Sequence, residues 1–225
     1  MDQPTASSRQ PKPANPPAEP PRLILGSSLI KLMPGLKSTR IQAIPGAHFC
    51  HLDRWAQCDE GRFVLRNKIK VIILCGGNSL ADGVLPDSVF SNALTSINII
   101  KSLTPDHCAI YLSTLPPRPQ IDIYSDNRFI FNKILISSHQ NDGLLVTDAE
   151  QGLLDPTSNL PKLSMLKTEE FSSNPKRDIV HLSPAGLVQL RRNYSRTLGR
   201  TRHGRTTPPF VIKKNEIGLT YSYHP

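Results

Sequence analysis

The sequence predicts an α/β domain, folded as a three-layer α/β/α sandwich around a mostly parallel, five-stranded sheet. Two observations lead to this prediction. Apolar strand-like runs alternate with helix-like segments over about 170 residues, the pattern that produces parallel sheets covered by helices. The strongest run, KIKVIILCGGNS, has a continuously apolar core rich in β-branched residues, as expected for a central parallel strand buried on both faces. The chain of 225 residues is long enough for one such domain with a sizeable core.

Five apolar runs are the expected strands, and glycines or prolines end most of them. The fourth run stops in the sequence PPRP, residues 116–119. This sequence allows two interpretations, a loop that ends a strand at the rim of the site or a short polyproline recognition site. The five runs occupy residues 21–29, 38–49, 68–79, 107–119 and 143–148.

Three segments between and after these runs have the composition of helices: 87–103, 126–140 and 183–198. Asp87 or Ser88 is the expected cap of the first, and Ser183 with Pro184 is a typical helix start, with a hydroxyl at the N-cap and proline at the first helical position. Residues 149–176 are rich in turn formers and predict a long loop that could cover the site.

The two ends of the chain differ from this domain in composition. Residues 1–21 are rich in proline, serine and alanine and predict a disordered arm, which leaves 22–198 as the folded domain and 199–225 as a basic, flexible tail. The arm lacks the apolar run of a signal peptide, and no stretch approaches the roughly 20 apolar residues that span a bilayer. We therefore expect a soluble, intracellular protein, in the cytoplasm.

Most of the formal net charge of +9 lies near the C-terminus, where residues 191–225 carry eight basic groups and one acidic group. An arginine-rich strip of this kind can bind phosphates in RNA, single-stranded DNA or anionic lipid. The alternative is a solvated tail that only keeps the protein soluble. The arginines that would make these contacts are Arg191, Arg192, Arg196, Arg200, Arg202 and Arg205.

The four cysteines show neither the spacing of a zinc site nor that of a disulfide framework. Cys75 and Cys108 lie in or beside strand-like runs, where free thiols pack as small apolar groups. The sequence thus predicts no metal and no disulfide, and nothing in it calls for an organic cofactor.

Candidate catalytic residues follow the predicted strands. In a doubly wound sheet, ligands bind beyond the carboxyl ends of the strands. Ser28 follows the first strand, Gly46 the second and Asn78 the third, and Asp178 with His181 precedes the last helix. Together they supply a hydroxyl nucleophile, oxyanion donors, a base and a carboxylate to orient that base. The other six histidines, His48 among them, have no comparable partners in the sequence and are expected to be structural or on the surface.

These short blocks resemble those of the SGNH hydrolases, the GDSL-type esterases and lipases, from about Arg22 to Leu190. "ILGSSL" is similar to the first block of the family, "IPGAHF" to the second, "GGNS" to the third and "DIVHLS" to the fifth. The resemblance implies a flavodoxin-like fold and a catalytic triad of Ser28, Asp178 and His181. It also implies an oxyanion hole made by the backbone N–H groups of Ser28 and Gly46 and by the side-chain amide of Asn78.

Two positions depart from the family pattern. Ser27 stands where the family has aspartate beside the nucleophile, and Ser79 stands where an aspartate follows the asparagine. Neither position supplies the nucleophile, the base or an oxyanion donor in the family, so activity is expected to survive. The Gly-Ser-Ser block with an arginine-rich flank is also similar to esterase domains of some retrotransposon and viral polyproteins.

Two functions of different classes follow from these features. The first is a serine esterase that hydrolyses an acetyl or acyl ester without metal or cofactor. The second is a catalytically weak protein of the same fold, from a mobile element or virus, that acts in nucleic-acid binding or assembly through its basic tail.

Overall fold

A computed structural model describes residues 19–118, 122–158, 160–166 and 182–199. Residues 1–18 of the predicted arm and 200–225 of the predicted tail lie outside these ranges, as do Arg200, Arg202 and Arg205. The described chain contains the five predicted strands. They are β1 (Arg22–Gly26), β2 (Thr39–Ala43), β3 (Lys70–Leu74), β4 (Ala109–Ser113) and β5 (Val146–Thr147).

The five strands form one sheet in the order β2-β1-β3-β4-β5, and every neighbouring pair is parallel. This is the flavodoxin-like order, in which the chain changes direction across the sheet between β1 and β3. Val71, Ile72 and Ile73 of β3 are fully buried, because helices cover both faces of the central strand. The predicted fold class is confirmed.

Six α-helices and two short 3₁₀ helices connect and cover the strands of the described chain. The three predicted helices are present as α4, α5 and α6, whereas α1, α2, α3 and the 3₁₀ helices η1 and η2 were not predicted. Their bounds are η1 Ser28–Ile30, α1 Phe49–Gln57, α2 Asp59–Leu65, α3 Gly77–Ala81, α4 Pro86–Ser102, α5 Asp122–Asn141, η2 Leu163–Met165 and α6 Pro184–Gly199.

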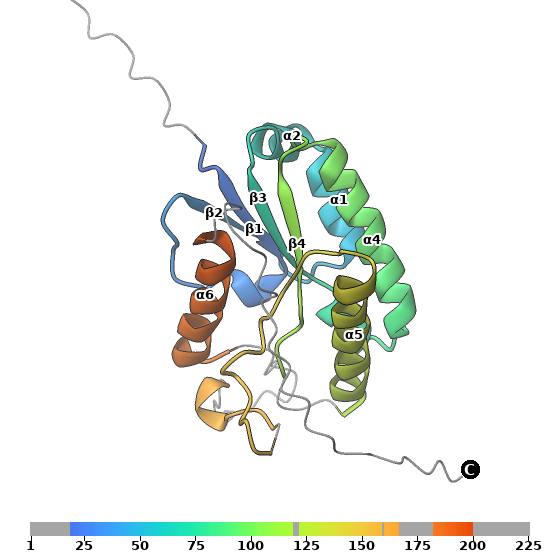
Figure 1. Ribbon diagram of the computed structural model, residues 1–225, viewed down its shortest axis with the longest axis vertical. Helices are drawn as coiled ribbons and strands as arrows, with labels where there is room; N and C mark the ends of the chain where they lie inside the picture. The colour runs from blue at the N-terminus through green and yellow to red at the C-terminus, as the bar shows by residue number, and fades with distance from the viewer. Residues whose placement is uncertain (1–18, 119–121, 159, 167–181, 200–225) are drawn as a thin grey trace, which may run out of the picture.

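The helices are divided unequally between the two faces of the sheet. Helices α1, α4 and α5 pack side by side on one face, and α6 lies on the other (Figure 1). Tyr194 of α6 is completely buried and its hydroxyl lies 2.9 Å from the Ser113 hydroxyl of β4. None of the helices in the described ranges combines the length and apolar character needed to cross a bilayer.

Helix α6 runs antiparallel to the strands. Its last turn packs on the sheet, where the Lys70 ammonium of β3 donates to the carbonyls of Thr197 and Leu198 at 3.1 and 3.0 Å and the Thr197 hydroxyl lies 2.6 Å from the Thr147 hydroxyl of β5. A cation at this position also complements the negative end of the helix dipole. The first turn of α6 lies toward the carboxyl edge (Figure 1), where parallel α/β sheets bind their ligands.

The two predicted helix starts had different outcomes. At α6 the Ser183 hydroxyl accepts from the Gly186 N–H at 3.2 Å, which confirms the predicted cap. At α4 the predicted caps Asp87 and Ser88 are wrong. The helix begins at Pro86, with Leu85 at the cap position and no side-chain cap. Proline at the first helical position decides the start, because its missing N–H is not needed there.

The predicted loop after β5 is described up to residue 166, except for 159, and its remainder, 167–176, lies outside the described ranges. The described part contains η2 and an isolated antiparallel bridge between Leu154 and Pro161. A second bridge joins Leu166 to Leu182, immediately before α6. This part of the loop is thus tied to the start of α6.

All four cysteines are free thiols in the structure. Cys75 is buried at the end of β3, and burial raises the pKa of its thiol to about 12. A thiol with such a pKa stays protonated at neutral pH and is a poor nucleophile. Cys75 is therefore a packing residue.

Candidate functional site

The end of β1 places Ser28 at the carboxyl edge of the sheet. Gly26 is required there, because a Cβ atom at this position would lie 2.4 Å from the Leu74 carbonyl oxygen of β3. Ser27 continues in an extended conformation with its side chain buried, and Ser28 begins η1. Ser28 is half-buried, and its hydroxyl and N–H have no hydrogen-bond partner within the described ranges. Both groups are available to a ligand.

The loop after β2 places Gly46 in a tight turn. The Ala47 N–H donates to the Ile44 carbonyl at 3.2 Å, with Pro45 and Gly46 between them. Gly46 has φ +68°, so the turn has the features of type II, which favours proline and then glycine at its two central positions. Gly46 is exposed, and its N–H has no partner in the described part of the chain. The turn thus presents a free backbone donor.

The end of β3 places Asn78 in the first turn of α3. Gly76 precedes the helix with φ +107°, a conformation that favours glycine. The Asn78 amide group donates from Nδ2 to the Ala47 carbonyl at 3.1 Å, and its Oδ1 accepts from Arg118 Nη2 at 3.1 Å. Asn78 therefore contacts the residue that follows Gly46.

Backbone hydrogen bonds join the three loop segments to one another. The Ser27 N–H donates to the Leu74 carbonyl at 3.2 Å, and the Ile44 N–H donates to the Gly26 carbonyl at 2.8 Å. The Asn78–Ala47 bond is the third link. The structure therefore brings the segments that hold the candidate nucleophile Ser28 and the two candidate oxyanion residues, Gly46 and Asn78, to one edge of the sheet. They meet between β1 and β3, where the strand order reverses.

Asp178 and His181 lie outside the described ranges. The described chain resumes at Leu182, which is buried and bridges Leu166. Leu182 immediately precedes the first turn of α6, which lies toward the same carboxyl edge as Ser28 (Figure 1). The middle of α6 also contacts the loop that follows η1, through the Arg191 guanidinium and the Gly35 carbonyl at 3.0 Å.

A histidine that the sequence did not distinguish joins two of these loops. His48 Nδ1 lies 2.9 Å from the Ser79 hydroxyl, and its Nε2 lies 3.6 Å from Asp82 Oδ2. His48 therefore has polar partners that the sequence did not reveal, and they fit the structural role that was expected for it. Through this contact Ser79 joins α3 to the loop that holds His48. No local pattern could reveal it, since the two residues are 31 positions apart.

These three residues form a serine–histidine–aspartate series, but its geometry does not favour nucleophilic chemistry. The Ser79 side chain is buried, with 6% of the residue exposed, so a substrate carbonyl has little access to it. Asp82 is largely exposed, and its distance of 3.6 Å from His48 is longer than a hydrogen bond. The series is better suited to holding the loops after β2 and β3 together.

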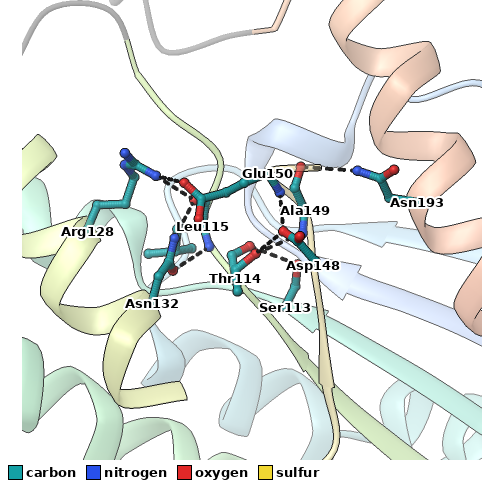
Figure 2. Close-up of polar contacts among 9 residues, drawn as sticks. All are labelled: Ser113, Thr114, Leu115, Arg128, Asn132, Asp148, Ala149, Glu150 and Asn193. Carbon is teal, nitrogen blue, oxygen red and sulfur yellow. Dashed lines mark hydrogen bonds and ion pairs between the residues drawn. The ribbon is translucent and has the colours of Figure 1, made fainter. Parts of the chain in front are cut away.

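A second polar network fixes the ends of β4 and β5 (Figure 2). The Thr114 hydroxyl donates to Asp148 at 3.2 Å, and Asp148 also accepts from the Glu150 N–H at 2.7 Å. Glu150 forms an ion pair with Arg128 of α5. Burial raises the pKa of both carboxyls, although hydrogen bonds to Asp148 and the charge of Arg128 beside Glu150 oppose the shift.

Asn132 of α5 extends this network to the segment that follows β4. Asn132 of α5 accepts from the Leu115 N–H at 2.8 Å and donates to the Leu115 carbonyl at 3.0 Å. Pro116 and Pro117 are buried, so PPRP does not present its first two prolines to a partner. Their burial favours the interpretation of this sequence as a strand-terminating segment, and Pro119 lies outside the described residues. Figure 2 shows Asn132, Leu115 and Arg128 converging at this point.

The three described arginines of the basic strip lie on α6. Arg191 contacts Gly35, Arg192 is exposed, and Arg196 donates to the Gln151 side chain at 2.9 Å. No cluster of three or more metal-ligating side chains occurs within the described ranges.

No protein-family model matches this chain, and no curated protein matches its sequence. Solved structures nevertheless share its fold. A GDSL-like lipase from Bacteroides thetaiotaomicron superposes with a TM-score of 0.60 at 13% identity, covering 80% of this chain and 88% of that chain. A lipase from a goat rumen metagenome gives a TM-score of 0.60 at 16% identity, covering 80% of this chain and 98% of that chain.

An acetyl-xylooligosaccharide esterase from Geobacillus stearothermophilus gives a TM-score of 0.58 at 15% identity, covering 82% of this chain and 98% of that chain. Identities of this size show a shared fold. The fold is therefore that of the GDSL-type lipolytic hydrolases, and the resemblance stated from the four sequence blocks is confirmed at the level of the fold.

Proposed function

We propose that the protein is a serine esterase that hydrolyses a carboxylic ester, an acetyl or longer acyl ester, through Ser28, His181 and Asp178. The observation that carries the proposal is the arrangement at the carboxyl edge of β1, β2 and β3. There a half-buried serine without a hydrogen-bond partner in the described chain follows β1, and hydrogen bonds join its loop to those of Gly46 and Asn78. The shared fold with GDSL-type lipases and esterases supports the same reaction class.

In this proposal Ser28 Oγ attacks the ester carbonyl while His181 takes its proton, and the carbonyl electron pair moves onto oxygen. The tetrahedral intermediate then expels the alcohol, which receives the proton from His181. Water attacks the resulting acyl-Ser28 with His181 again acting as base, and the carboxylic acid leaves as the Ser28 hydroxyl is restored. Asp178 holds the imidazole in the required tautomer.

The oxyanion of each intermediate would be held by the N–H groups of Ser28 and Gly46 and by the Asn78 amide. The two N–H groups have no partner in the described chain, and the Asn78 amide group has a second N–H beyond the one directed at Ala47. Removing one such donor typically costs about 10²- to 10³-fold in kcat.

Chain connectivity supports a role for His181 at this edge. His181 directly precedes Leu182, and consecutive Cα atoms are about 3.8 Å apart. Leu182 leads into the first turn of α6, which lies toward the carboxyl edge of the sheet (Figure 1). Asp178, three residues earlier, can reach the second ring nitrogen of His181 without a long-range contact.

The test is the hydrolysis of p-nitrophenyl acetate, butyrate and decanoate by the wild type and by Ser28→Ala. We expect turnover by the wild type and its loss in the variant. Ser27→Ala is the matched control, because Ser27 makes no side-chain cap bond, and it should retain activity. His181→Ala should lose most of the turnover. Equal hydrolysis by the wild type and Ser28→Ala would end the proposal.

A second function is favoured by the placement of charge. Arg192 is exposed on α6, and the basic strip continues from there toward residue 214. We propose that residues 199–225 bind RNA, single-stranded DNA or anionic lipid without sequence readout, because base-specific contacts need a rigid element. Such a tail could tether an active esterase, or it could act alone in a catalytically weak protein.

A further inference from the structure

Arg118 occupies an unusually constrained position at the candidate site. It is the last described residue of the segment that follows β4, and only 5% of its surface is exposed. Two buried prolines precede it, which fixes two backbone φ angles near −65°. Leu115, before the prolines, is held by both groups of the Asn132 amide. Arg118 therefore has a defined place rather than the mobility usual for a long cationic side chain.

The Arg118 guanidinium is directed at the Asn78 side chain. Its Nη2 donates to Asn78 Oδ1 at 3.1 Å, across 40 positions of sequence and from the loop after β4 to that after β3. A guanidinium has only donors, so the atom of Asn78 that it contacts must be the oxygen. The Ala47 carbonyl has only acceptors, so the atom of Asn78 that it contacts must be the nitrogen.

These two contacts leave one orientation of the Asn78 amide. Rotation by 180° would place Nδ2 against the guanidinium and Oδ1 against a carbonyl, which costs both hydrogen bonds and adds two repulsive contacts. In the observed orientation one N–H of Nδ2 is used by Ala47, and the other is left for a ligand. Hydrogen bonding of Oδ1 to a cation also polarises the amide and makes this N–H a stronger donor.

We propose that Arg118 is a positioning residue that acts through Asn78, fixing the orientation of the amide and strengthening its remaining N–H as an oxyanion donor. The inference rests on the proposed esterase function and deepens it. Arg118 need not touch the substrate for this role. The sequence predicted that PPRP lies at the rim of the site, where Arg118 could contact substrate, whereas the structure places Arg118 against Asn78, a member of the candidate oxyanion hole.

The experiment is a double-mutant cycle with p-nitrophenyl acetate: wild type, Arg118→Met, Asn78→Ala and the double variant. A positioning role predicts that Arg118→Met lowers kcat about 10- to 100-fold with KM changed less than about threefold, since a misplaced catalytic group costs up to about 100-fold. In the Asn78→Ala background the same change should lower kcat by less than about twofold, because the group through which Arg118 acts is gone.

Arg118→Lys provides a second series, because lysine keeps the charge and much of the volume but lacks the planar fork. It should give an intermediate loss that also disappears in the Asn78→Ala background, and it replaces Arg118→Met in the cycle if the methionine variant does not fold. Arg62→Met, on the exposed side of α2, is the control and should leave kcat unchanged.

The outcomes separate this inference from the proposed function. Turnover that depends on Ser28, together with losses that add in the cycle, would overturn the Arg118 role and leave the esterase proposal standing. A wild-type kcat in Arg118→Met would do the same. Turnover that does not depend on Ser28 would overturn both.

Discussion

Replacement of Gly26 by alanine tests whether the end of β1 is built to hold Ser28 beside β3. The added Cβ would lie 2.4 Å from the Leu74 oxygen, whereas ordinary contacts lie at 3.4–4 Å, so β1 and β3 would have to separate locally by about 1 Å. Overpacking in a well-packed interior costs about 1–3 kcal/mol. We expect the upper end, because the shift also strains the Ser27–Leu74 hydrogen bond. The melting temperature should fall by about 6–12 °C.

The measurement is thermal unfolding followed by circular dichroism, together with the rate of labelling by a fluorophosphonate probe. Gly35→Ala is the matched control, since a Cβ at Gly35 meets nothing within 4 Å and its φ is not positive. Its free energy of unfolding should differ from that of the wild type by less than about 1 kcal/mol. A small increase is compatible with the reasoning, because alanine restricts the unfolded chain more than glycine does. A Gly26→Ala protein that melts and is labelled like the Gly35→Ala protein would refute the reasoning.

Three further predictions concern the buried carboxyls, the His48 contact and the tail. Because burial raises the pKa of Asp148, that carboxyl favours the fold below its unfolded pKa and loses this contribution as pH rises through its folded pKa. Asp148→Asn keeps an acceptor oxygen, so its melting temperature should exceed that of the wild type at pH 7. The difference between the two melting temperatures should shrink toward pH 4, and a difference that does not change with pH would contradict this. Ser79→Ala removes the hydrogen bond to His48 and should lower the free energy of unfolding in urea by about 1 kcal/mol, while labelling by the fluorophosphonate probe persists. A folded variant that no longer reacts with the probe would show that Ser79 takes part in the chemistry. Deleting residues 199–225 should abolish binding to single-stranded nucleic acid and leave ester hydrolysis unchanged. For the full chain, the logarithm of the binding constant should fall with the logarithm of the salt concentration at a slope of roughly −3 to −4, as expected for about five phosphate contacts. Binding retained after the deletion would refute the role of the tail.

The strands and three of the helices could be predicted from the sequence because their signals are local. Runs such as VIIL in KIKVIILCGGNS are apolar without interruption, and a Ser-Pro pair opens α6. Helix α1 carried a comparable signal in the spacing of Phe49, Leu52 and Ala56, which are all buried. It was missed because histidine, aspartate and arginine lie between them, so that the mean hydropathy of the segment is low.

The contacts that organise the site could not be predicted in the same way. Arg118 and Asn78 are 40 positions apart, and His48 and Ser79 are 31 positions apart. Both pairs meet because parallel strands bring their carboxyl ends to one edge, and which side chains then touch depends on the turns that follow each strand. The sequence could place these residues at one edge of the sheet, but the pairing required the structure.

The central claim is that Ser28 is the nucleophile. Its most direct test is to label the protein with a fluorophosphonate probe and identify the modified serine by mass spectrometry of the peptides. All candidates lie in the described chain: Ser28 in η1, its buried neighbour Ser27, and Ser79 beside His48. The proposed mechanism predicts a single adduct on Ser28, which disappears in Ser28→Ala and persists in Ser27→Ala. An adduct on Ser27 or Ser79, or no adduct on a protein that hydrolyses p-nitrophenyl acetate, would contradict it.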